Sequence, residues 1–153
     1  MASFFYNTGM TEMLDGTIDI DTDTLKLMFV NGSYTADKDD LVVDAAGAND
    51  PIDHELSGTG YAAGWGGAGR KTAAITMQAN NTNDRTDIAI DDLTWTAIDA
   101  GTIEGVILIK EGGANDTTSR LIAYFDVSQV TNGGNITLDF ATLGAGGNMQ
   151  VAN

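Results

Sequence analysis

Three aspartates near the start of the chain alternate with other residues and could ligate a cation. Asp19, Asp21 and Asp23 lie in the stretch IDIDTDTLK. An EF-hand loop beginning at Asp19 would need glycine at its sixth position and glutamate at its twelfth, where this chain has Thr24 and Val30. Another type of calcium site is the lesser hypothesis, because carboxylates on one face of an extended segment repel each other without a cation. We expect instead a turn, since the apolar residues are even-numbered before it and odd-numbered after it.

A second stretch, GWGGAGRKT, shares its glycine spacing with nucleotide-binding motifs. Gly64, Gly66 and Gly69 match G-x-G-x-x-G, and Arg70 stands where a P-loop has its lysine. Both motifs need a buried strand before the glycines and, after them, a helix whose N-terminus binds phosphate. Here the preceding residues are loop-like, and the following TAAITMQA has the pattern of a strand. We therefore predict a glycine-rich loop and no bound cofactor.

The residue types for catalysis are sparse. His54 is the only histidine, which excludes a metal centre with two or three histidines from one chain. A hydrolase triad of Asp53, His54 and Ser57 is compatible with the spacing, because triads assemble in space, but no serine lies in a nucleophile-elbow sequence. Pairs of carboxylates arise by chance in so acidic a chain and do not indicate glycosidase chemistry. We predict a protein that is not an enzyme and has no catalytic residues.

Length and charge restrict the classes of protein further. The 153 residues predict one domain spanning 1–153, with residues 1–16 as a candidate N-terminal arm. A net charge of -15, with only 7 lysines and arginines, argues against binding to nucleic acid or to an anionic membrane. The absence of cysteine excludes disulfides. No stretch has the pattern of a signal peptide or a membrane span, so we expect a soluble product of the cytoplasm.

The remaining sequence has the pattern of strands. Short segments rich in Ile, Val, Thr and aromatic residues are separated by turn residues, and little helical pattern lies between them. These segments are LKLMFV, TAAITMQA, TDIAI, LTWTAI, GTIEGVILIK, RLIAYFDV and NITLDFATL. One helical turn is expected in MTEMLDG, ending at Gly16. The pattern predicts an all-β fold, specifically an antiparallel, jelly-roll-like β-sandwich with long glycine-rich loops.

Aromatic and basic residues outside the clearest strand patterns are the candidates for contact with another protein. Three consecutive aromatics near the N-terminus could form a strand of the sheet or an arm that docks onto a neighbouring subunit. Tyr61 and Trp65 lie in the glycine-rich stretch, followed by the only adjacent basic pair, which could contact an acidic neighbour. The candidate interface residues are Phe4, Phe5, Tyr6, Tyr61, Trp65, Arg70 and Lys71.

An ordered series of motifs resembles a family of small structural proteins from the virions of tailed bacteriophages. The series is LDGTIDIDTDTLKLMFVNGSYTADKDD, HELSGTGYAAGW, DLTWTAI, GVILIKEG and LIAYFDV, and it covers roughly residues 14–138. This chain departs from the family pattern at Ile20, where a large aromatic is expected, and at Ala36, where proline is common.

The resemblance implies a non-enzymatic capsid decoration, or cement, protein on the outer surface of the virion head. The expected partners are the major capsid protein and further copies of the chain in a homotrimer, since local three-fold points of a capsid are natural docking sites. A tail, fibre or receptor-binding module that recognises host carbohydrate is the alternative. The family brings no active-site residues to carry over to this chain.

Overall fold

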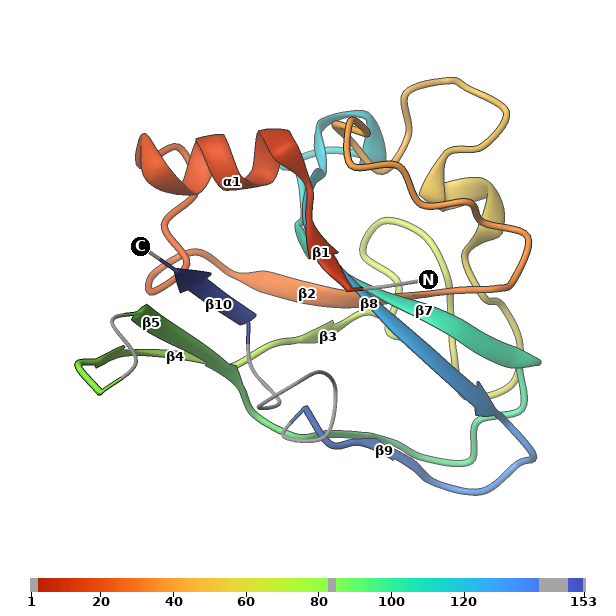
Figure 1. Ribbon diagram of the computed structural model, residues 1–153. Coiled ribbons are helices and arrows are strands. Elements are labelled where there is room, and N and C mark those ends of the chain that lie inside the picture. Colours follow the sequence, from red (N-terminus) through yellow and green to blue (C-terminus); the bar gives the residue numbers. More distant parts are fainter. Residues whose placement is uncertain (1–2, 83–84, 141–148, 153) are drawn as a thin grey trace.

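The computed structural model describes residues 3–82, 85–140 and 149–152, and most of its regular structure is β (Figure 1). In chain order the elements are β1 (Phe4–Phe5), α1 (Asn7–Leu14), β2 (Leu25–Val30), η1 (Pro51–His54), β3 (Lys71–Thr72), β4 (Ile75–Asn80), β5 (Arg85–Ile90), β6 (Leu93–Trp95), β7 (Thr102–Lys110), η2 (Asp116–Thr118), β8 (Arg120–Val130), β9 (Ile136–Leu138) and β10 (Met149–Ala152). The two η elements are short 3-10 helices. Among the residues described, every helix is too short or too polar to span a bilayer.

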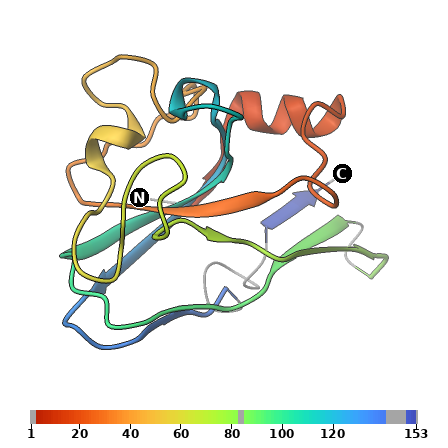
Figure 2. The ribbon, with the colours of Figure 1, turned by 180° about the vertical axis from the view of Figure 1, so that it is seen from behind.

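The strands pair antiparallel in three sheets, which confirms the predicted all-β class. The largest sheet has the order β1-β8-β7-β2-β3, and two smaller sheets have the orders β10-β5-β4 and β6-β9. The connection 31–55 and α1 lie on one side of the largest sheet, and β4, β5 and β9 lie on the other (Figures 1 and 2). The central strands of the largest sheet are therefore covered on both faces.

The side chains of β2 show that a separate cluster of buried residues packs on each face of the largest sheet. Leu25, Leu27 and Phe29 join a cluster of buried side chains that includes residues of β5, β6 and β9. Met28 and Val30 point to the opposite face and join a second cluster. Since successive side chains of a strand point to opposite faces, a strand that is apolar on both sides is expected at the centre of a covered sheet.

The predicted turn in the acidic stretch is present. The backbone amides of Thr22 and Asp23 both donate to the carbonyl of Asp19, at 3.3 and 2.8 Å. The carboxylate of Asp23 accepts the amide of Asp19 at 2.9 Å and the Lys110 ammonium at 2.6 Å. These hydrogen bonds hold the pKa of Asp23 below its usual value, the bond from Lys110 being the main cause. The turn changes the phase of the apolar residues and leads the chain into β2.

The N-terminal residues are part of the sheet. β1 pairs with β8, with Phe4 opposite Tyr124 and Phe5 opposite Ala123. α1 begins at Asn7, so it is longer than the single turn predicted in residues 10–16, and Gly16 follows it with a φ of 81°. The helix lies against β8 at Gly9, where a Cβ would stand only 2.8 Å from the Cα of Ile122. Glycine at this position allows the close approach of helix and strand.

Candidate functional site

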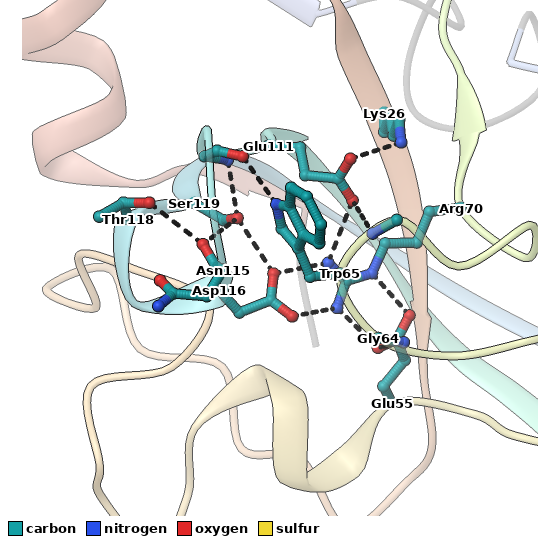
Figure 3. Close-up of polar contacts among 12 residues, drawn as sticks. Lys26, Glu55, Gly64, Trp65, Arg70, Glu111, Asn115, Asp116, Thr118 and Ser119 are labelled. Atoms are coloured by element: carbon teal, nitrogen blue, oxygen red, sulfur yellow. Dashed lines mark hydrogen bonds and ion pairs between the residues drawn. The ribbon is translucent and has the colours of Figure 1, made fainter.

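A buried arginine joins three segments that are far apart in the sequence (Figure 3). Arg70 is 3% exposed, and its guanidinium forms two hydrogen bonds with Glu55, at 2.8 and 2.7 Å. The same group forms two more with Asp116, at 2.7 and 3.0 Å. Glu111 lies 3.6 Å away. The planar guanidinium fits this use because its donors match two carboxylates in a bidentate manner.

The carboxylates around Arg70 also bind the backbone of the glycine-rich loop. Glu55 accepts the amide of Gly64 at 2.8 Å, and Glu111 accepts the amide of Gly66 at 3.1 Å. On the other side, Asp116 accepts the hydroxyl of Ser119 at 3.0 Å. We name this set of groups, Glu55, Arg70, Glu111 and Asp116, the arginine cluster. Through these hydrogen bonds the arginine cluster fixes the conformation of residues 64–70.

Within the arginine cluster, hydrogen bonds with the carboxylates offset the effect of burial on the charge of Arg70. Burial alone would lower the pKa of Arg70, but its hydrogen bonds with Glu55 and Asp116 outweigh this effect and raise the pKa above its ordinary value. Tyr61, which is 1% exposed, donates from its hydroxyl to Glu55 at 3.1 Å and accepts the amide of Phe29 at 2.9 Å. Burial, together with the nearby charge of Glu55, raises the pKa of Tyr61. The arginine therefore stays charged and the tyrosine stays neutral near neutral pH.

The fixed loop presents one large aromatic side chain to solvent. Trp65 is 46% exposed, although its indole N–H already donates to the carbonyl of Gly112 at 2.7 Å. Gly64 and Gly66 on either side have φ values of 86° and 69°, a region that favours glycine. Because the polar atom of Trp65 is bonded within the chain, the indole offers a partner mainly apolar surface. An aromatic side chain held in place in this way loses little conformational entropy on binding.

The other predicted interface residues lie in different settings. Tyr6 is fully buried, with its hydroxyl 2.9 Å from that of Tyr34, while Phe4 and Phe5 are half-buried in β1. Lys71 is half-buried, donates to the carbonyl of Thr94 at 2.5 Å and lies over the ring of Trp95.

Most of the predicted contacts therefore lie within the chain. The acidic neighbours of Arg70 are its own chain's Glu55 and Asp116. Tyr6, Tyr61 and Arg70 are at most 3% exposed and so offer almost no surface to a partner in this conformation. Trp65 remains as the exposed member of the predicted set.

The residues considered for catalysis or metal binding are exposed, lack a polar partner or bind the backbone of their own turn. Asp53 and Ser57 are exposed, and the Nε2 of His54 is buried without a hydrogen-bond partner. The carboxylates of Asp19 and Asp23 bind backbone amides of their own turn. In residues 3–82, 85–140 and 149–152, no group of three or more His, Asp or Glu side chains is arranged to hold a metal ion.

Comparisons of the chain with protein-family models, with curated proteins and with solved structures found no match. The candidate site therefore rests on the geometry of this chain alone. It is the loop of residues 64–70, which the arginine cluster holds in place and which exposes Trp65 to solvent.

Proposed function

We propose that this protein is a non-enzymatic capsid decoration protein of a tailed bacteriophage, which binds the major capsid protein on the outer head surface and stabilises the capsid. The ordered motif series supports the virion assignment, and the antiparallel strands agree with the proposed jelly-roll-like sandwich. The observation that carries the binding role is Trp65, exposed on a loop that buried ion pairs hold in one conformation.

The chemistry of the loop indicates how such a protein would bind. A half-exposed indole with its N–H already satisfied suits an apolar pocket on the partner, and aromatic anchors of this kind dominate many protein interfaces. The chain has a net charge of -15, so the partner surface around that pocket should be neutral or basic. Several copies engaged on one shell would act together, so that modest individual contacts resist the pressure of packaged DNA.

A tail or fibre module that recognises host carbohydrate is the second candidate. The same exposed Trp65 favours it, because an indole face can stack on a sugar ring. In that case the protein would act at the tail and not on the head shell. Purified protein would then block adsorption of the phage to its host.

Image reconstruction of the purified virion distinguishes the two candidates. A decoration protein should appear at high copy number at repeated positions on the head shell. Density for the chain at the tail tip only, together with inhibition of adsorption by the free protein, would reject the head assignment and favour the carbohydrate-binding module.

A further inference from the structure

β4 is an open edge of the three-stranded sheet. It is the terminal strand in the order β10-β5-β4, and its pairing with β5 is regular from Ile75 to Asn80, without a bulge. A strand at such an edge presents unpaired N–H and C=O groups along its outer side. None of the other strands described pairs with this side of β4.

The other terminal strands among the described residues are shorter. β1 and β3, which end the largest sheet, have 2 residues each, β6 and β9 have 3 each and β10 has 4, whereas β4 has 6. Natural proteins commonly protect an edge by shortening it or by placing charges, proline or bulges along it. Residues 72–82 contain no charged residue and no proline, in a chain that is 19% charged. β4 thus lacks the usual features that prevent strand addition.

The hydrogen-bond pattern identifies the groups that face outward. The amide of Asp91 donates to the carbonyl of Ala74 at 3.0 Å, and Ala74 stands opposite Asp91 in the continued register of β4 and β5. In an antiparallel ladder, hydrogen-bonded pairs alternate with pairs that are not bonded to each other. Residues 76, 78 and 80 therefore bond to β5, while the N–H and C=O of Ile75, Met77 and Ala79 point to the open side.

Apolar surface adjoins the same edge. A groove of about 330 Å³ lies between α1, the turn at residues 16–20 and the sheet. Its lining includes Met10, Met13, Leu14, Ile20, Met77 and Ile88. Leu14 and Met77 are 76% and 44% exposed, and they are two of the five large hydrophobic side chains that are exposed in the described chain.

We propose that β4 pairs antiparallel with β4 of a second copy of this chain, about a two-fold axis perpendicular to the sheet. Two copies of so acidic a chain repel each other, so a self-contact is favoured where charge is absent, and β4 is such a place. The two-fold axis makes the contact isologous and keeps Met77 of both copies on the same face. The two sheets would join into one, and the two apolar grooves would lie on the same side of it.

Two variants and a control test this pairing by the mass of the particle in solution. Wild-type protein, measured by light scattering over a range of concentrations, should approach twice the chain mass of 16.0 kDa. Ala79→Pro removes an outward N–H without removing a bond to β5, and Met77→Lys adds a charge to the uncharged edge of each copy. Both should give monomers, whereas Val130→Lys, at another exposed apolar strand position, should remain dimeric.

Other outcomes of this measurement would overturn the proposal. A wild-type mass of 16.0 kDa at every concentration would do so, as would the trimer that the family resemblance implies. A dimer that survives in both folded variants, with circular dichroism like that of the wild type, would assign the contact elsewhere. The result does not depend on the proposed function, because a protein that fails to bind phage heads could still pair through β4.

Discussion

Arg70 is the residue on which the display of Trp65 depends most directly. Its guanidinium, 3% exposed, compensates the charges of Glu55 and Asp116, which are 9% and 6% exposed. Burying such an ion pair gains little net stability compared with apolar residues of the same volume, because all the charges lose their hydration. Breaking the pair is different, since the remaining carboxylates stay buried without a counter-charge. We infer that the main effect of the arginine cluster is to hold the loop of residues 64–70 in one conformation.

Replacing Arg70 tests this interpretation. Arg70→Met should lower the free energy of unfolding by about 3–5 kcal/mol, because it leaves Glu55 and Asp116 uncompensated. The neighbouring Lys71→Met is the control, with a smaller loss of about 1–2 kcal/mol for its hydrogen bond to the carbonyl of Thr94 and its contact with Trp95. Urea unfolding followed by tryptophan fluorescence gives both values. Equal, small losses in the two variants would show that the buried ion pairs do not hold the loop.

α1 approaches the backbone of β8 most closely at Gly9, where a side chain would clash. Alanine normally favours a helix over glycine by about 1 kcal/mol. At position 9, however, the added Cβ would lie 2.8 Å from the Cα of Ile122, which is backbone and cannot move aside as a flexible side chain would. The clash should outweigh the gain in helix propensity, since overpacked positions commonly lose about 1–3 kcal/mol.

We therefore predict that Gly9→Ala destabilises the protein by about 1–3 kcal/mol in thermal or urea unfolding. Gly113→Ala is the matched control, because no heavy atom lies within 4 Å of the added Cβ, and its effect should stay within about 0.5 kcal/mol. A Gly9→Ala protein more stable than the wild type would mean that α1 can move away from β8 at no cost.

The sequence pattern predicted the five longer strands and also the 3-residue strands β6 and β9. β2 and β7 fall wholly within predicted segments, whereas β4, β5 and β8 extend one to three residues beyond theirs. β3 and β10 were not predicted as separate strands, because 2 or 4 residues are too few to show an alternating pattern. α1 begins earlier than predicted because Asn7 is hydrogen-bonded to Lys38 and Asp39 and Gly9 packs on β8, contacts that the local sequence pattern does not show.

The candidate site was only partly accessible from sequence. Trp65 and Arg70 were selected from their composition alone, as an aromatic and a basic residue in a glycine-rich stretch. The roles of Glu55 and Asp116 were not predicted, because they lie 15 and 46 residues from Arg70 and only the fold brings them together. One signal was present in the sequence: with 22 acidic and 7 basic residues, any buried arginine is expected to find carboxylate partners.

The two proposed contact surfaces, the loop that carries Trp65 and the open edge of β4, lie far apart in the molecule. The connection that carries Trp65, residues 56–70, and the β4–β5 hairpin lie in opposite halves of the protein in both views (Figures 1 and 2). If both proposals hold, a dimer formed through β4 would carry one Trp65 on each side of the joined strands. Such an arrangement could bridge two positions on a capsid, and the second contact would form at a high effective concentration.

The most direct test of the proposed function measures occupancy on phage heads that lack the protein. Wild-type protein and Val130→Ala, which truncates another exposed apolar side chain, should both bind at repeated positions on the shell. Trp65→Ala should fold with a loss of about 1 kcal/mol, for the hydrogen bond to Gly112, yet leave the heads largely unoccupied. Full occupancy by the folded Trp65→Ala protein, or no binding by the wild type, would contradict the account.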